Sequence, residues 1–141
     1  MPRFLFLSAL AVFVTAACGG GGEVRECEPE GACFCTEGTE RETLCVCEGG
    51  SDCSIDGDNI EFECDGNAAC GLACGEDCLV TCPGTTSCTV EVGDGAVVSC
   101  PGTSTCHVTC FGDCEINVDG AASAEVDCVH EDQGAVCEIN G

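Results

Sequence analysis

Cysteine is the residue type with the most chemistry to offer in this sequence, because its thiol can act as a nucleophile, bind a soft metal or form a disulfide. The chain contains 19 cysteines among 141 residues. The stretch Cys82–Cys106, CPGTTSCTVEVGDGAVVSCPGTSTC, holds four of them among turn residues and alternating small apolar residues. Which chemistry applies decides whether we expect an enzyme, a metal protein or a disulfide scaffold.

The cysteines recur with a fixed period. Cys64, Cys82 and Cys100 are spaced 18 residues apart. Glycines recur every nine residues, at Gly66, Gly75, Gly84, Gly93 and Gly102. Within each unit apolar residues and cysteines alternate with polar ones, as in Cys88–Val92, which is typical of a half-buried β-strand. Each unit is therefore predicted to contain two short strands and two turns.

The predicted fold is all-β, a small disulfide-stapled β-solenoid-like repeat with about 18 residues and two short strands in each coil. Stacked coils would bury the cysteines and valines, whereas a flat antiparallel meander would leave one apolar face exposed. The inward residues are Ala, Val and Cys, which predicts an interior too narrow for Phe. We expect a Cys-rich hairpin module at 27–53 and the repeat domain at 54–141.

Comparison of the aligned units favours disulfides over metal ligation. Cys74 and Cys78 are replaced together by Val92 and Ala96 in the next unit. A bonded pair is lost in this way, whereas a metal site that lost two ligands would keep two orphan thiols. With Cys18 set aside the number of cysteines is even, which predicts complete pairing and no free nucleophile. Pairing of consecutive cysteines predicts Cys27–Cys33, Cys35–Cys45, Cys47–Cys53, Cys64–Cys70, Cys74–Cys78, Cys82–Cys88, Cys100–Cys106, Cys110–Cys114 and Cys128–Cys137.

Other pairings fit parts of the chain and stay open. A hairpin-type scheme would form Cys53–Cys64, Cys70–Cys82 and Cys88–Cys100. Within residues 23–53, a nested scheme centred on Glu40 would form Cys27–Cys53, Cys33–Cys47 and Cys35–Cys45. The Cys-Phe-Cys and Cys-Val-Cys motifs of this module could instead bind a soft metal through thiolates, a minor alternative.

The N-terminal residues predict export. Residues 1–17 combine one positive charge, the apolar run Phe4–Val14 and small residues before Cys18, the pattern of a signal peptide. The small residues before Cys18 resemble the lipobox of bacterial lipoproteins, although Thr15 stands where that motif usually has Leu, Val or Ile. The resemblance implies that Cys18 is lipidated and that residues 18–26, rich in Gly, form a flexible tether. It places the protein on the bacterial outer membrane or cell surface, held to the membrane by its lipid anchor.

Charge limits the possible partners. Removal of the leader with Arg3 changes the formal net charge from −23 to −24, which excludes nucleic acid as a partner. Acidic residues fall in the predicted turns at one end of successive coils, namely Asp56, Asp58, Glu76, Asp77, Asp94 and Asp113. Stacked carboxylates repel one another and could bind Ca²⁺. This period resembles that of calcium-binding β-rolls, but their GGxGxDxUx pattern is absent here.

The sequence offers no catalytic constellation. His107 is predicted to lie on the outward side of a strand, and His130 in an acidic loop, without a matching nucleophile. The chain as a whole resembles bacterial surface lipoproteins with cysteine-rich repeats, which implies a location rather than an activity. We therefore expect a non-enzymatic surface lipoprotein, a rigid acidic module for display, adhesion or binding of a protein or glycan ligand. The alternative is a Ca²⁺-binding surface protein; no other cofactor is expected.

Overall fold

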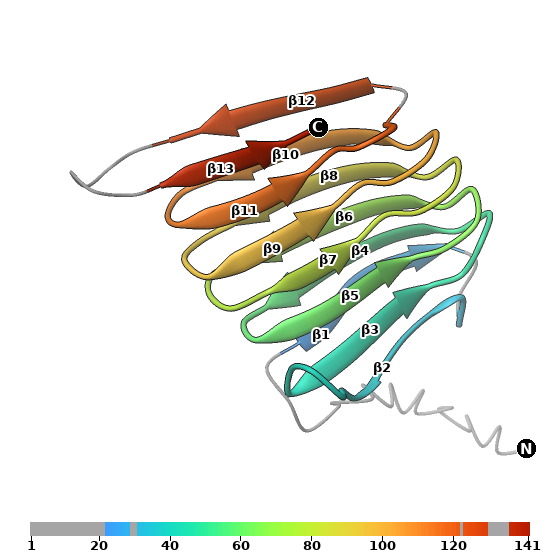
Figure 1. The fold of residues 1–141 in the computed structure, drawn as a ribbon. Coiled ribbons are helices and arrows are strands. Elements are labelled where there is room, and N and C mark those ends of the chain that lie inside the picture. Colours follow the sequence, from blue (N-terminus) through green and yellow to red (C-terminus); the bar gives the residue numbers. More distant parts are fainter. Residues whose placement is uncertain (1–21, 29–30, 122, 130–135) are drawn as a thin grey trace, which may run out of the picture.

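The computed structural model describes residues 22–28, 31–121, 123–129 and 136–141. These residues form two β-sheets that face each other (Figure 1). The first, sheet A, contains β1 (Gly22–Glu28), β4 (Asp52–Gly57), β6 (Ala69–Cys74), β8 (Ser87–Val92), β10 (Thr105–Cys110) and β12 (Ser123–Cys128). The second, sheet B, contains β2 (Cys33–Glu37), β3 (Thr43–Cys47), β5 (Ile60–Cys64), β7 (Leu79–Thr81), β9 (Ala96–Ser99), β11 (Cys114–Asn117) and β13 (Cys137–Asn140).

The chain alternates between the sheets and forms a β-solenoid of about five turns with about 18 residues per coil. Equivalent strands of successive coils pair in parallel and in register. In sheet A, for example, Cys70 lies opposite Cys88, and Cys88 lies opposite Cys106. The solenoid prediction is confirmed and the meander is excluded, because a meander would pair consecutive strands antiparallel.

The N-terminal part departs from this regular pattern. Strand β1 pairs antiparallel with β4, and β2 pairs antiparallel with β3 in a hairpin. Strand β3 then pairs in parallel with β5, so the hairpin belongs to sheet B. The predicted boundary between residues 53 and 54 therefore falls inside β4, and β1 begins at Gly22, within the predicted tether.

Alternation along each strand places one set of side chains between the sheets. Val90 and Val108 stack there from sheet A, and Val98 and Ile116 from sheet B, all fully buried. Phe62 is also in this core with an exposed fraction of 1%, contrary to the prediction that Phe would not fit. Its register neighbours are Cys45 and Val80, and these small side chains leave room for the ring.

Disulfides close the turns at both edges of the solenoid. On the edge where the chain passes from sheet B to sheet A, they are Cys64–Cys70, Cys82–Cys88 and Cys100–Cys106. On the opposite edge they are Cys74–Cys78, Cys110–Cys114 and Cys128–Cys137. Each disulfide that closes such a short loop contributes about 2 kcal/mol to the free energy of unfolding by the chain-entropy estimate. Where the central coil lacks the second bridge, Val92 and Ala96 are buried instead.

Candidate functional site

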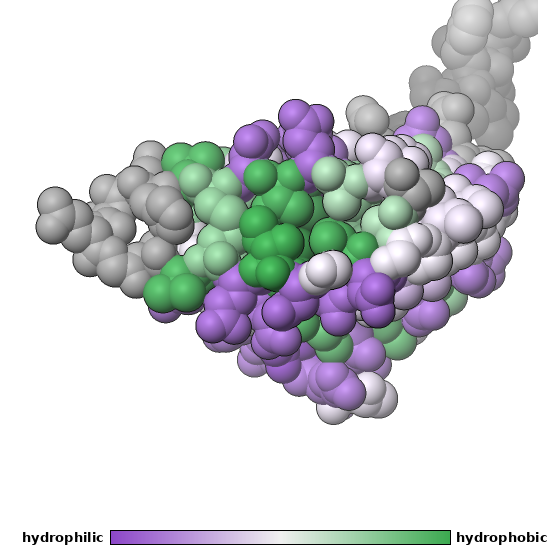
Figure 2. Space-filling view, turned by 45° about the horizontal axis from the view of Figure 1, so that its top comes forward, coloured by the Kyte–Doolittle hydropathy of each residue, from purple (hydrophilic) through white to green (hydrophobic). Residues whose placement is uncertain are grey.

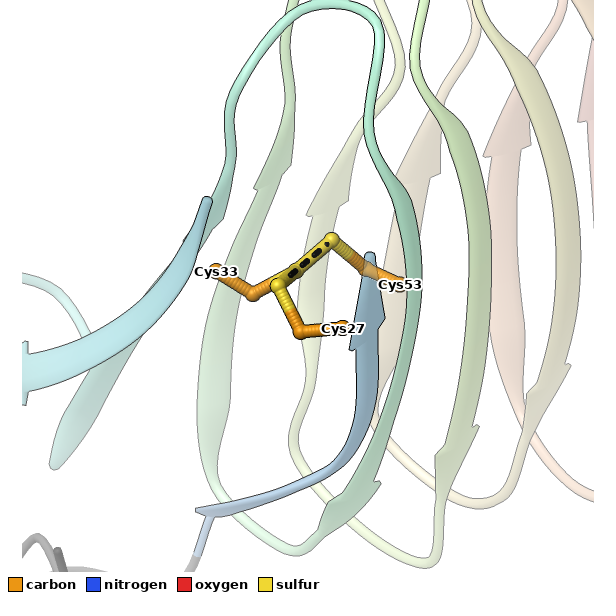
Figure 3. Close-up of side chains that lie close together, drawn as sticks. All are labelled: Cys27, Cys33 and Cys53. Atoms are coloured by element: carbon orange, nitrogen blue, oxygen red, sulfur yellow. Dashed lines mark hydrogen bonds between the residues drawn. A yellow bond between two sulfur atoms is a disulfide. The ribbon is translucent and has the colours of Figure 1, made fainter. Parts of the chain in front are cut away.

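Four cysteines gather where the solenoid begins. Cys27 on β1, Cys33 on β2 and Cys53 on β4 point their sulfurs toward one another (Figure 3). The sulfur of Cys33 lies at bonding distance from those of both Cys27 and Cys53. It is also 3.7 Å from the sulfur of Cys47 on β3, while the sulfurs of Cys27 and Cys53 are 3.9 Å apart. We call Cys27, Cys33, Cys47 and Cys53 the sulfur cluster.

The predicted Cys47–Cys53 disulfide is not formed in the structure. Strands β1 and β2 bring two further sulfurs to Cys53, so Cys53 contacts Cys33 and leaves Cys47 as a buried thiol. A sulfur takes part in one disulfide at a time, so the two contacts of Cys33 are alternatives. The nearby pair Cys35–Cys45 is bonded across the β2–β3 hairpin.

Two complete pairings of the sulfur cluster fit this backbone. Cys27 lies directly opposite Cys53, and Cys33 directly opposite Cys47, as the nested scheme requires. Cys47 and Cys53 also lie in register with Cys64 and Cys70, which are joined to each other, as the consecutive scheme requires. The antiparallel strands β1 and β2 thus favour the nested pairing of the sulfur cluster, whereas the register of the parallel repeat favours the consecutive pairing.

Metal binding at the cysteines depends on their redox state. Among the described residues, two groups bring three candidate ligand atoms together, namely Cys27, Cys33 and Cys53, and Cys82, Cys100 and Cys106. Sulfurs held in disulfides offer no thiolate to a metal. Burial also raises the pKa of the Cys47 thiol to about 12, which opposes the deprotonation that a metal ligand needs. The oxidised protein is therefore poorly suited to hold a soft metal here.

The predicted acidic turn residues line one edge of the solenoid, where the chain passes from sheet A to sheet B. We call this the aspartate edge; it comprises the turns at 58–59, 75–78, 93–95 and 111–113. Asp58, Glu76, Asp77, Asp94 and Asp113 lie in these turns, one coil above another. Asp56 differs, because it lies within β4 and is only half-buried.

Two carboxylates of the aspartate edge accept hydrogen bonds from the backbone of the next coil. Asp94 Oδ1 accepts a hydrogen bond from the Asp113 amide at 3.0 Å. Asp113 Oδ1 accepts one from the Val136 amide at 2.6 Å. The side chain of Asp58 likewise lies against Gly75, where a Cβ atom would collide with it. Asp94 and Asp113 thus help to position the turns that follow them in the stack.

Backbone hydrogen bonds account for the positions of Asp94 and Asp113 without an ion. Among the described residues, no set of three carboxylates brings its oxygen atoms close enough to one another to share a metal ion. The sequence showed that these residues would stack but did not indicate their backbone partners. The missing signal is the small residue one coil further on, such as Gly75 or Gly112, which leaves room for the carboxylate.

His107 lies on the outer face of sheet A, as predicted. Its Nδ1 is 3.2 Å from Glu125 Oε2, and its Nε2 is 3.7 Å from Asp127 Oδ2, both on the next strand. Glu125 and Asp127 are largely solvent-exposed and His107 is half-exposed, so the contacts link β10 to β12 without forming an enclosed site. His130, Cys18 and the predicted signal peptide at 1–17 lie outside the described residues.

Comparison with known proteins gives no further assignment. No protein-family model, no curated protein and no solved structure matches the chain. Within the described residues, no helix has the length and apolar composition needed to span a membrane.

Proposed function

We propose that this protein is a non-enzymatic surface lipoprotein that displays a rigid, acidic, disulfide-rich module for adhesion or ligand binding. The disulfides that close successive turns carry this proposal, because such bonds persist in oxidising compartments and mark an extracytoplasmic protein. The lipobox-like residues before Cys18 supply the anchor. Attachment to the outer membrane or cell surface follows from that anchor.

The shape of the molecule supports a display role. Strand β1 lies at one end of sheet A and β12 at the other, with the coils stacked between them (Figure 1). An anchor that precedes β1 would therefore hold one end of the solenoid near the membrane and direct the other end outward. Disulfides within the coils make the module resistant to proteolysis, since they limit the local unfolding that proteases need.

Labelling with radioactive palmitate tests the anchor. We expect the wild-type protein to incorporate label and Cys18→Ala to incorporate none, because lipoprotein acylation takes place on that cysteine. Antibodies against the module should label intact cells if it is displayed on the surface, whereas antibodies against a periplasmic marker protein should not. Equal labelling of both variants, or a wild-type protein found only in the medium, would contradict the proposal.

A Ca²⁺-binding function is the second candidate, with weaker support. Its candidate ligands lie on the aspartate edge, where Asp94 and Asp113 already accept backbone hydrogen bonds. Calorimetric titration with Ca²⁺ decides between the two functions. We expect neither a heat of binding nor a change in melting temperature; a saturable heat that disappears in Asp94→Asn would favour the calcium function.

A further inference from the structure

The C-terminal end of the solenoid leaves its core open to solvent. Strands β12 and β13 are the last strands of their sheets, and no described residue pairs with their outer edges. Ile116 on β11 is fully buried, whereas its register partner Ile139 on β13 is 51% exposed. Val126 on β12 is likewise only partly buried, although its partner Val108 is fully buried.

The exposed apolar side chains form one continuous patch. Figure 2 looks onto this end and shows hydrophobic surface in the middle, bordered by hydrophilic surface. The described apolar residues of this end are Val126, Val129, Val136 and Ile139. We call them the open end. An apolar patch with a polar border is a feature of protein interaction sites.

The outer edges of β12 and β13 also offer hydrogen-bonding groups to a partner. Each outer edge presents N–H and C=O groups without a partner strand in the described part of the chain. A further strand added beside β12 would extend sheet A and lie about 4.8 Å away. Strand addition of this kind gives affinity through main-chain hydrogen bonds and specificity through alternate side chains.

The side chains of β12 define what such a strand must contain. Val126 faces the core, while Glu125 and Asp127 face outward and are exposed. An added strand would therefore place every second residue over the core and the others beside these carboxylates. Apolar residues suit the first positions, and Lys or Arg suits the second.

We propose that the open end binds an extended segment of a partner protein in which apolar residues alternate with Lys or Arg. This inference rests on the proposed display function and names the surface and the partner chemistry that it serves. A second copy of this chain is a poor occupant, because it would bring Glu125, Asp127 and a net charge of −23 against the same charges.

Fluorescence anisotropy with synthetic peptides tests the proposal on the purified full-length protein. The probe is a labelled ten-residue peptide of alternating Val and Lys. One control peptide has the same composition in two blocks, and a second has Glu in place of Lys. We expect saturable binding of the alternating Lys peptide only; equal binding of the block peptide would show mere charge attraction and overturn the inference.

Two variants locate the binding surface. Ile139→Glu should weaken binding about tenfold or more, because it removes apolar contact from the open end. The matched control is Phe34→Glu at the opposite end, where Phe34 is 42% exposed. It should bind like the wild type, and an equal loss in both variants would contradict the assignment. Circular dichroism should show that both remain folded, as their exposure permits.

Charge neutralisation gives an independent readout. The double variant Glu125→Gln, Asp127→Asn should bind more weakly and lose most of the salt dependence of binding. The control Glu63→Gln, Asp65→Asn removes the same charge from exposed positions on and just after β5, away from the open end, and should have little effect. Unchanged binding by the first variant would overturn the predicted partner chemistry.

Sedimentation velocity tests whether a second copy of this chain occupies the open end instead. We expect a monomer at micromolar concentration, and a dimer that Ile139→Glu disrupts would assign the open end to a second copy and overturn the inference. The peptide assay requires no acyl chain, so its outcome is separate from the palmitate experiment. Lipidated, surface-exposed protein that binds no peptide would keep the proposed function and remove only this inference.

Discussion

The two ends of the solenoid finish the same stack in different ways. At the N-terminal end, β1 and β2 run antiparallel to their neighbours, and Cys33 and Cys35 are buried there. At the C-terminal end of sheet B, the register position that Cys35 occupies belongs to Ile139, which solvent reaches, as it does Val126 at the same end of sheet A. The comparison shows that stacking buries a coil only when both of its faces are covered.

A tetrapeptide that occurs twice allows a covered and an uncovered strand to be compared without any difference in local sequence. The sequence Cys-Glu-Ile-Asn occurs at Cys114–Asn117 and again at Cys137–Asn140, and the two copies pair in register as β11 and β13. The isoleucine of the first copy is fully buried and that of the second is half-exposed. The difference in burial comes from the neighbouring coils and not from local sequence.

Complete reduction should produce the largest effect and remove the difference between the ends. Each disulfide that closes a short turn contributes about 2 kcal/mol, and the core between them is small, so we expect global unfolding without denaturant. Hydrogen exchange before and after reductant measures this. Protection that persists in the central coils of the reduced protein would show that apolar packing alone holds the stack.

Truncation of the two equivalent isoleucines should separate the covered coil from the uncovered one. Ile116→Ala creates a cavity in a filled core and should lower the free energy of unfolding by about 2–5 kcal/mol. Ile139→Ala removes a side chain that solvent already reaches and should cost less than about 1 kcal/mol. Urea unfolding gives both values, and equal losses would mean that the open end is covered in solution.

Loss of one aspartate of the aspartate edge should have a smaller effect. Asp94→Ala leaves the Asp113 amide without its side-chain acceptor and should cost about 1 kcal/mol. Asp94→Asn keeps an oxygen in that position and should lie close to the wild type. Asp113→Ala acts at the C-terminal end, where it should speed hydrogen exchange of Val136 without changing the central coils. Global acceleration instead would contradict a coil-to-coil role.

The sulfur cluster should give no pH dependence at all if its four cysteines pair completely. A Cys47 thiol would have a pKa near 12 in the folded protein against 9.0 when unfolded, so stability would fall by about 1.4 kcal/mol per pH unit between these values. Tyr and Lys, which usually titrate there, are absent from the sequence. We expect a flat profile and, apart from Cys18, no alkylation of the unfolded, unreduced protein.

One alkylated cysteine per chain other than Cys18 would contradict complete pairing. If none is found, disulfide mapping by mass spectrometry distinguishes the two schemes. The nested scheme joins β1 to β4 through Cys27 and Cys53, whereas the consecutive scheme joins β1 to β2 through Cys27 and Cys33.

The regular part of this fold could be predicted because its cysteines and apolar residues recur in the sequence with a fixed period. Spacing of Cys64, Cys82 and Cys100 specified the coil, and alternation such as that in Cys88–Val92 specified the inward face. Phe62 was misjudged because the space it occupies depends on Cys45 and Val80, which are distant in sequence. The sequence left the pairing within the sulfur cluster open because β1 and β2 follow no period, and the structure places Cys33, not Cys47, next to Cys53.

The candidate surface was less accessible to prediction. Ile139 has the same local sequence as Ile116, so its exposure depends on the absence of a covering strand in the described stack. The role of Asp94 was hidden for a related reason, because its partner is the backbone of Asp113 in the next coil. Contacts between coils determine both features, and a single unit does not encode them.

The placement of the sulfur bridges also bears on how such a chain can change its length. The bridges of the regular coils join residues four or six positions apart, so each one begins and ends around a single turn. Duplication or deletion of one whole unit would carry its own bridges with it and leave the partners of every other cysteine unchanged. Gene-level slippage could thus lengthen or shorten the rod in fixed steps without creating mispaired thiols.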